Sequence, residues 1–223
     1  MKNKLFSLAS TITLVLITGI FLTGHGFGVR QNAGFLDDYS LLEPSPYHDD
    51  TKRYRKPGID LSQYNKFIFE PIDIFYSPDS EYKGISPEEL MLLADSFRDL
   101  IIKEFEPKYP VIQTPGKGVL LVRTAITNVK IKKEKRGLFS YIPISLSVTA
   151  MQDAVGHHIM LDDSDIEAEV IDTETGEMVA LLVDSKVGKT SEGEDTWEAL
   201  KESLIVHARR LRQTLDEARK TPD

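Results

Sequence analysis

The chain has 223 residues, of which 41% are hydrophobic and 28% charged, with a formal net charge of −8 and no cysteine. A chain of this length and composition indicates one globular domain that can bury a core without disulfides. The missing cysteine excludes thiol nucleophiles and iron–sulfur ligation. The acidic balance opposes binding to phosphate backbones, so no nucleic-acid partner is expected.

Residues 1–26 are typical of an export signal. Two lysines stand in the first four residues, and Leu5–Leu22 follows without a charge, which predicts a signal peptide or a retained membrane anchor. Leu22-Thr23-Gly24 is the tripeptide that precedes the lipid-modified cysteine of bacterial lipoproteins, but His25 comes next. The export signal predicts a protein of the periplasm or cell envelope, either soluble or N-terminally anchored. Because imidazole cannot form the thioether to diacylglycerol, we expect this protein to lack the lipid.

Residues 27–62 are polar and rich in turn-forming residues, which predicts an extended polar arm. Residues 63–220 are expected to form a single globular α/β domain, with regular structure from Lys66 onward. The apolar run Phe67–Tyr76 predicts a strand, which Pro71 restricts to a bulge or a sheet edge. The apolar side chains of the arm are expected to lie on the domain surface: Phe35, Leu36, Tyr39, Leu41 and Leu42.

The next segment carries the clearest helix signal. Ser86 can cap a helix, Pro87 suits its first position, and Glu89 stands three residues after the cap. Pro107 ends the pattern. Between them an apolar stripe recurs at steps of three and four: Leu90, Leu93, Ala94, Phe97, Leu100, Ile101 and Phe105.

Three strands are predicted after this helix. Residues 119–131 indicate a long strand, and residues 166–172 and 177–184 indicate a hairpin around the turn at Thr173–Gly176. Alternation in the first hairpin strand places Glu167 and Glu169 outward, in solvent. The inward residues are then Ile166, Ala168 and Val170.

A final helix is predicted to start at Asp195 or Thr196. His207 falls on its charged side, where we expect it to be exposed. The apolar stripe consists of Trp197, Leu200, Leu204, Ala208, Leu211, Leu215 and Ala218.

The order strand, helix, strand, hairpin, helix predicts an α/β (α+β) fold. Each helix has one apolar face, so the helices should cover a mixed β-sheet. The first strand–helix–strand unit is expected to be a right-handed crossover between parallel strands.

No catalytic, cofactor or metal site is predicted. Val187–Thr190 looks like the end of a phosphate-binding loop, but Val183 stands where that motif requires glycine. His157-His158 and the aspartates after it match neither zinc nor calcium spacing, and no Gly-x-Ser-x-Gly elbow is present. We therefore expect a protein that is not an enzyme; the alternative is a hydrolase with an unrecognised site.

The uncharged run Leu138–Met151 is a candidate contact to a membrane or a partner. A basic cluster from Lys130 to Arg136 precedes it, and such a cluster beside apolar and aromatic residues suits an anionic membrane surface or a protein partner. The alternative, which we favour, is a connection packed in the core. The candidate contact residues are Phe139, Tyr141, Ile142, Ile144 and Leu146.

Several stretches resemble one family of bacterial envelope lipoproteins, domain of unknown function (DUF) 3313. They are Gly34–Ser40, Pro78–Leu90, Glu167–Glu169 and Asp172–Glu177, and the likeness extends in register from residue 34 to the final helix. The family usually carries the lipid-modified cysteine whose place His25 takes here. No catalytic residues are assigned to the family, so the resemblance implies none.

The element order also resembles the periplasmic domains of curli secretion channels, of lipoprotein activators of penicillin-binding proteins and of TolB. In the channels, segments inserted between strands enter the membrane, which gives a fold-level analogy for residues 138–151. We expect a non-enzymatic binding or assembly module whose partner is an envelope protein or a membrane surface. A membrane-inserting oligomer using residues 138–151 is the alternative, and a homo-oligomer is compatible with both.

Overall fold

The computed structural model describes residues 32–78, 80, 87–131, 159–161, 163–185 and 197–220. Several predicted features lie outside these residues: the export signal, the Ser86 cap, the His157-His158 pair, the Val187–Thr190 stretch and the start of the final helix. Within the described residues, no helix is long and apolar enough to cross a membrane.

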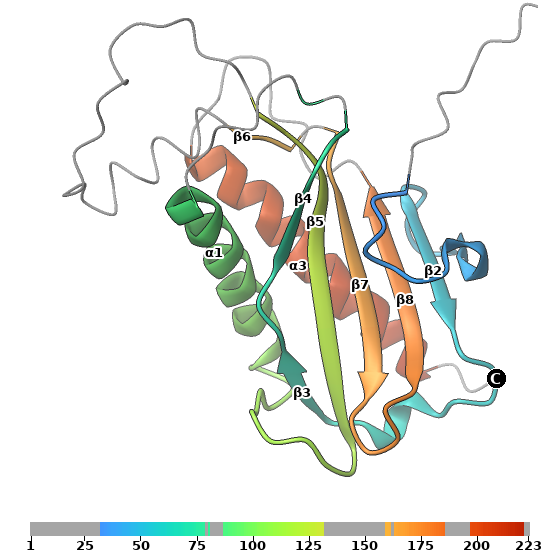
Figure 1. Ribbon diagram of the computed structural model, residues 1–223. Helices are drawn as coiled ribbons and strands as arrows, with labels where there is room; N and C mark the ends of the chain where they lie inside the picture. Colours follow the sequence, from blue (N-terminus) through green and yellow to red (C-terminus); the bar gives the residue numbers. More distant parts are fainter. Residues whose placement is uncertain are drawn as a thin grey trace, which may run out of the picture. The chain divides into compact units, whose positions relative to one another are not determined.

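A mixed sheet of eight strands forms the framework (Figure 1). Its order is β1-β2-β8-β7-β5-β3, and β4 and β6 also pair with β5. β3 and β4 run parallel to β5, and the remaining pairs are antiparallel. The strands are β1 (Glu43–Pro44), β2 (Thr51–Arg55), β3 (Lys66–Phe69), β4 (Asp73–Tyr76), β5 (Val119–Ile131), β6 (Ile159–Met160), β7 (Asp165–Asp172) and β8 (Met178–Ser185).

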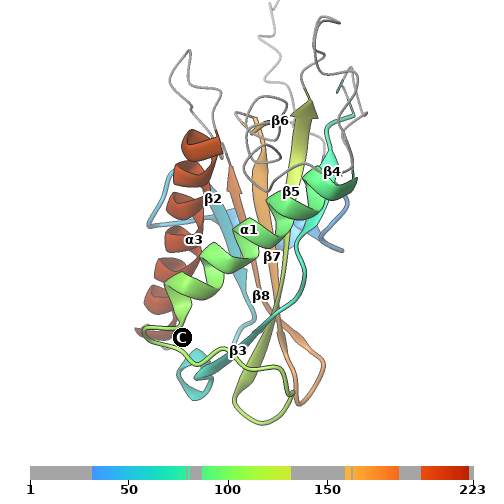
Figure 2. The same ribbon diagram turned by 90° about the vertical axis from the view of Figure 1, so that its left-hand side faces the viewer.

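Two helices, α1 (Pro87–Phe105) and α3 (Trp197–Lys220), pack on one face of this sheet (Figure 2). Together with the mixed sheet they confirm the predicted α+β fold. β3 and β4 precede α1 and both run parallel to β5, which follows α1, as expected; Pro71 lies between β3 and β4. The hairpin β7–β8 and the long strand β5 are also where the sequence predicted them.

The core between the sheet and the helices is built from the predicted apolar stripes. α1 buries Leu93, Phe97, Ile101 and Phe105, and the Phe105 ring packs edge-on against Phe69 with ring centroids 4.9 Å apart. Such edge-to-face pairs add to the stability gained by burial alone. α3 buries Trp197, Leu200, Leu204, Ala208 and Leu211. Both stripes are therefore confirmed.

Regular structure begins earlier than the sequence predicted. β2 pairs with β8 over its whole length, from Thr51 opposite Asp184 to Arg55 opposite Ala180. The expectation that strands start only near Lys66 is therefore wrong. β2 was not predicted because its sequence, Thr-Lys-Arg-Tyr-Arg, has no apolar alternation. Backbone pairing with β8 places this strand in the sheet.

The turn at Asp172–Glu177, part of the family-like sequence, closes the β7–β8 hairpin. The Asp172 carboxylate accepts hydrogen bonds from the Glu174 N–H at 2.8 Å and the Tyr64 hydroxyl at 3.0 Å. Gly176 has φ +73°, a conformation that glycine adopts without steric cost. The Thr173 hydroxyl bonds the backbone of the loop before β5. These contacts give this motif a structural role.

We expect Phe97→Ala to destabilise the protein by about 3–5 kcal/mol, because it removes a fully buried ring and leaves a cavity. Met91→Ala on the same helix is the matched control: this side chain is 59% exposed, and its loss should change stability by no more than about 0.5 kcal/mol. Urea unfolding curves measure both. Equal effects would contradict the observed register of α1.

Candidate functional site

The face of the sheet opposite the helices is covered by a short segment, residues 32–42, which we call the strap. Its Phe35 and Leu36 are buried against Ala125 of β5 and Leu181 of β8, in a small second core that is separate from the helix-side core. Figure 1 shows this segment at the blue end of the colour range, beside β2 and β8. The sequence predicted that the apolar residues of the arm pack onto the surface of the domain, and these contacts confirm it.

Tyr39 organises the strap and ties it to the sheet. Its phenol oxygen accepts hydrogen bonds from the backbone N–H groups of Gly34, Phe35 and Leu36 at 3.1, 3.2 and 3.3 Å. Its hydroxyl donates to Glu167 Oε2 of β7 at 2.6 Å. One side chain therefore fixes the backbone shape of the strap and connects it to a strand more than a hundred residues away.

Glu167 is 2% exposed, although the sequence predicted it outward in solvent. That prediction is wrong because the strap covers the face to which alternation correctly assigns the residue. Burial raises the pKa of the Glu167 carboxyl, and the nearby Asp165 raises it further. Hydrogen bonds from Tyr39 and Thr127, the latter at 2.9 Å to Oε1, oppose this increase in pKa without cancelling it.

Asp165, two residues before Glu167, lies beside an irregularity in β5. Asn128 has φ +58°, the register between β4 and β5 shifts there, and the Asn128 amide donates to Asp165 Oδ2 at 2.8 Å. Such bulges bend a strand and redirect its end. Although two carboxylates lie close together, the described residues contain no group of three or more His, Asp or Glu side chains that could hold a metal ion.

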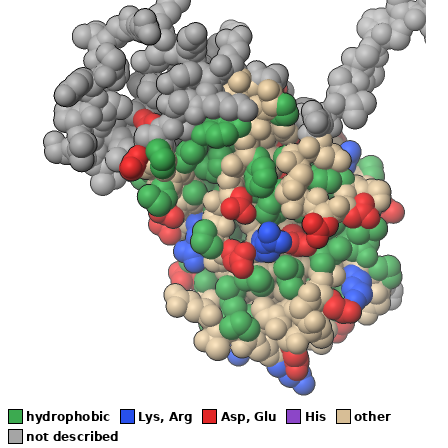
Figure 3. Space-filling model, viewed as in Figure 1, with side chains coloured by type: hydrophobic (Ala, Val, Ile, Leu, Met, Phe, Trp, Pro, Cys, Tyr) green, Lys and Arg blue, Asp and Glu red, His purple; other side chains and the backbone are tan. Residues whose placement is uncertain are grey.

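Beyond the strap, the same face carries a row of three aliphatic side chains, which we call the open row. Ile68 of β3 pairs with Leu121 of β5, which pairs with Ile171 of β7. All three are half-buried and belong to neither core. Figure 3 views this face and shows hydrophobic side chains with a band of acidic and basic ones between them.

An ion-paired band borders the open row. Arg123 of β5 donates to Glu169 at 2.6 Å, and its guanidinium lies 3.5 Å from the Glu70 carboxylate. The Arg123 guanidinium also lies over the Phe35 ring of the strap, 5.5 Å from the ring centroid. The second face of the sheet therefore consists of the covered apolar part, this band and the open row.

A buried polar cluster lies on the helix side of the sheet. Asp184 of β8 is 1% exposed and accepts from the Thr51 hydroxyl at 2.9 Å and from Arg210 at 3.2 Å. His207 of α3 is 4% exposed, and its Nδ1 lies 2.5 Å from Asp184 Oδ2. The prediction that His207 is exposed is wrong. Its position three residues after Leu204 and four before Leu211 was the signal that placed it on the buried stripe.

The Asp184–His207 cluster does not have the geometry of a nucleophilic triad. The one hydroxyl in it, that of Thr51, donates to the carboxylate and not to the imidazole, so no activated nucleophile results. Burial alone would raise the pKa of Asp184, but the hydrogen bonds from His207 and Thr51 and the charge of Arg210 hold it below its usual value. The cluster joins β2, β8 and α3.

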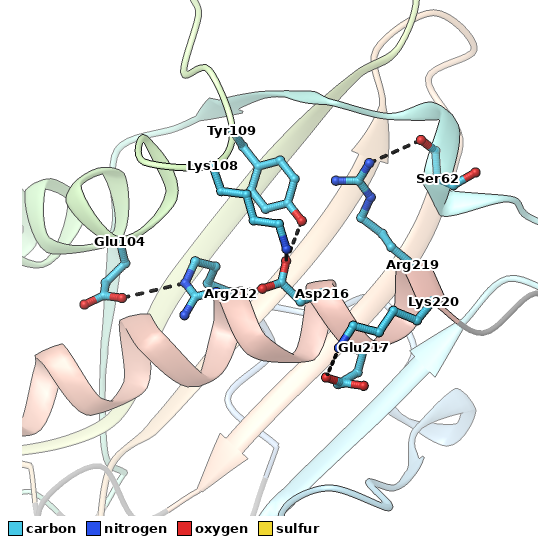
Figure 4. A network of polar contacts seen from close by, with 9 residues as sticks. All are labelled: Ser62, Glu104, Lys108, Tyr109, Arg212, Asp216, Glu217, Arg219 and Lys220. Carbon is cyan, nitrogen blue, oxygen red and sulfur yellow. Dashed lines mark hydrogen bonds and ion pairs between the residues drawn. The ribbon is translucent and has the colours of Figure 1, made fainter.

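A third polar network fastens the end of α3 to the segment that follows α1 and to Ser62 (Figure 4). The Asp216 carboxylate accepts from Lys108 at 2.7 Å, from Arg212 at 2.6 Å and from the Tyr109 hydroxyl. Arg219 donates to the Ser62 carbonyl oxygen at 3.2 Å. The contacts of Asp216 with Lys108 and Tyr109, and of Arg219 with Ser62, join α3 to other parts of the chain, which indicates a structural role.

The residues predicted to contact a membrane or partner, Phe139, Tyr141, Ile142, Ile144 and Leu146, lie outside the described residues. The described ends on either side of them are paired. Lys130 and Ile131 of β5 pair antiparallel with Met160 and Ile159 of β6. The chain therefore leaves and re-enters the sheet at the same end.

Comparisons with known proteins give one matching family, a relative of similar sequence, and solved structures of low similarity. A family model described as protein of unknown function (DUF3313) matches residues 31–211. The uncharacterized lipoprotein YdcL of Escherichia coli K12 is 28% identical over 166 residues, 74% of this chain and 74% of that protein.

Two solved structures are similar at a low level. A PelC dodecamer from Paraburkholderia phytofirmans has 9% identity and a TM-score of 0.37, covering 71% of this chain and 96% of that one. A DUF4136 family protein from Bacteroides thetaiotaomicron has 8% identity and a TM-score of 0.38, covering 77% and 98%. At these values neither structure indicates a function for this chain.

We expect Asp184→Ala to destabilise the protein by about 2–5 kcal/mol, because it removes the acceptor shared by Thr51, His207 and Arg210 and leaves the buried Thr51 hydroxyl and His207 ring without this partner. Asp163→Ala is the control: this carboxylate is 64% exposed beside Lys130, and its loss should cost no more than about 1 kcal/mol. Chemical unfolding at pH 7 measures both changes.

The pH dependence gives a second measurement. The folded-state pKa of Asp184 lies below its usual value of 3.8. The stabilisation that ionised Asp184 gives the folded protein is therefore complete above pH 3.8 and is lost as pH falls through the folded-state pKa. The stability difference between the unaltered protein and Asp184→Asn should therefore shrink below pH 3.8. A difference that instead grows on acidification would contradict this assignment.

Proposed function

The chain belongs to the DUF3313 family of proteins of unknown function, and from its own contacts we propose that it is a non-catalytic binding or assembly module of the bacterial cell envelope. The export signal predicted for residues 1–26 and the lipoprotein named among its relatives support the location. The second face of the sheet supports the role. The proposed partner is an envelope protein that docks on the open row.

The observation that carries this proposal is the open row itself. Ile68, Leu121 and Ile171 stand side by side on three neighbouring strands, on the face opposite α1 and α3, and pack in neither core. Covering apolar surface gains about 25 cal/mol per Å². The band of Arg123 with Glu70 and Glu169 beside the row gives the apolar-centre, polar-rim arrangement found in protein interfaces.

The buried titratable groups support a role without catalysis. The carboxylates of Asp184, Glu167 and Asp216 each bond side chains from other elements of the fold. A general acid or base needs a reacting group within hydrogen-bond reach, and these carboxylates are instead engaged in holding strands, helices and the strap together. No observation among the described residues favours the hydrolase alternative.

A membrane-inserting oligomer remains the second candidate, and one observation favours it. β5 and β6 are antiparallel neighbours, so the segment between them starts and ends at one end of the sheet, as an insertion that contacts a membrane requires. Its contact residues would be those named from the sequence: Phe139, Tyr141, Ile142, Ile144 and Leu146.

A photo-crosslinking residue at Leu121, in the full chain in intact cells, should give a discrete protein adduct, because the open row is the proposed docking surface. Ile171→Glu in the same chain should abolish the adduct by placing a charge beside Leu121, without loss of the folded circular dichroism spectrum. The matched control is the same probe at Gln213, an exposed position on α3, which should give no adduct.

Adducts of equal yield at Leu121 and Gln213, or none at Leu121, would contradict docking on the open row. A probe at Ile144 tests the second candidate in the same cells. Adducts with phospholipid from that position would favour membrane insertion.

We also propose that the N-terminus is not lipidated at the position of His25, since imidazole lacks the thiol that bonds diacylglycerol. Labelling cells with a clickable fatty acid should leave the unaltered protein unlabelled, and His25→Cys should become labelled. Gly26→Cys, which moves the thiol one residue away from Leu22-Thr23-Gly24, is the control and should stay unlabelled. Strong labelling of the unaltered protein would refute this proposal.

A further inference from the structure

We infer that residues 32–42 form a reversible, proton-sensitive strap that regulates access to the second face of the sheet, with the Tyr39–Glu167 contact as its fastening. This inference rests on the proposed function for its meaning, because the surface that the strap hides is the continuation of the proposed docking surface. The opening of the strap can be measured without a partner.

The strap can separate from the sheet without disrupting a strand pair. Its only regular element is the short 3₁₀ turn Tyr39–Leu41, and the first strand, β1, starts at Glu43. Its attachments to the sheet are side-chain contacts: the apolar packing of its hydrophobic residues, the Arg123 guanidinium over the Phe35 ring, and one hydrogen bond, from Tyr39 to Glu167. Segments held by few contacts open at lower free energy than the core.

Opening would expose an apolar surface that continues the open row. Ala125 and Leu181, now covered, lie on the same face as Leu121, because alternate residues of a strand share a face. Met178, which packs against the strap cluster, pairs with Ile171 of the open row. The face would then present apolar residues on both sides of the band of Arg123, Glu70 and Glu169, a larger docking area than the open row provides alone.

The groups around Glu167 determine how protons act on the strap. Tyr39 faces it from the strap, Thr127 from β5, and Asp165 lies beside it on β7. The residue opposite it on β8 is the apolar Val183. Among the described residues no Lys or Arg forms an ion pair with Glu167, so neither neighbouring strand neutralises its charge.

The sign of the pH effect follows from this environment. The closed strap raises the pKa of Glu167 by burying it, whereas opening returns the carboxyl to water and to its ordinary pKa. The closed state therefore binds a proton more tightly than the open state. Closure should be favoured at lower pH and should weaken as pH rises through the closed-state pKa of Glu167. The pKa of Tyr39 is also raised, mainly by burial, so its ionisation acts in the same direction.

Hydrogen exchange of the full chain tests the inference. The N–H groups of Gly34, Phe35 and Leu36, which bond Tyr39, should exchange faster at pH 7.5 than at pH 5 after correction for intrinsic rates. Tyr39→Phe removes their acceptor and should speed their exchange about tenfold at both pH values. Glu167→Gln keeps an acceptor for Tyr39 but does not titrate, so it should abolish the pH dependence.

Tyr64→Phe is the matched control. Tyr64 is also a buried tyrosine that donates to a carboxylate, Asp172 at 3.0 Å, but it lies outside the strap. Its substitution should leave exchange at residues 34–36 unchanged. Because the chain has no cysteine, Val183→Cys supplies one thiol under the strap, and its labelling rate should follow the same pH dependence.

Two results would overturn the inference. If residues 34–36 exchanged only as fast as the amides of β5, the strap would open solely with global unfolding. If Glu167→Gln left the pH dependence intact, Glu167 would not be its cause. The proposed docking role is tested separately at Leu121, which packs outside the strap cluster, so either idea can fail alone.

Discussion

A sheet that two helices cover on one face only must find other cover for its second face, and this constraint shapes much of the molecule. α1 and α3 pack against the helix-side core, and no helix of the described residues lies on the opposite side of β5, β7 and β8. The strap covers part of that side with Phe35 and Leu36. Sheets become stable when both faces that carry apolar residues are packed. The remaining part, the open row, packs in neither core of the described residues, and this is why it is the proposed docking surface.

Local sequence signals predicted the elements that carry their own pattern. α1 has an apolar stripe and a proline at its first position, and β5 is a long apolar run, so both were found with nearly correct bounds. The β7–β8 hairpin was found from its alternation and its turn. β2 was missed because Lys52, Arg53 and Arg55 give it no apolar face, and only its pairing with β8 makes it a strand.

The two wrong predictions about polar residues have a common physical cause. Alternation and helical period assign a side chain to a face, but they do not say what lies over that face. Glu167 was placed on the correct face and buried by the strap, while His207 lies at the border of an apolar stripe and meets Asp184 across the core. The sequence signal for cover over the second face was the presence of three apolar or aromatic residues in a polar arm: Phe35, Leu36 and Tyr39.

The two faces of the sheet treat a buried carboxylate in opposite ways. On the helix side, Asp184 has an imidazole, a hydroxyl and a guanidinium around it, and its pKa is lowered despite burial. On the strap side, Glu167 has two hydroxyl donors and a neighbouring acid, and its pKa is raised. As pH falls, Glu167 therefore gains its proton before Asp184 does. Over that range the protein gains a proton under the strap while the Asp184 carboxylate keeps its charge. A pH change would then alter how firmly the strap covers the second face while Asp184 stays ionised in the helix-side cluster, which is the separation that regulation of the proposed docking surface requires.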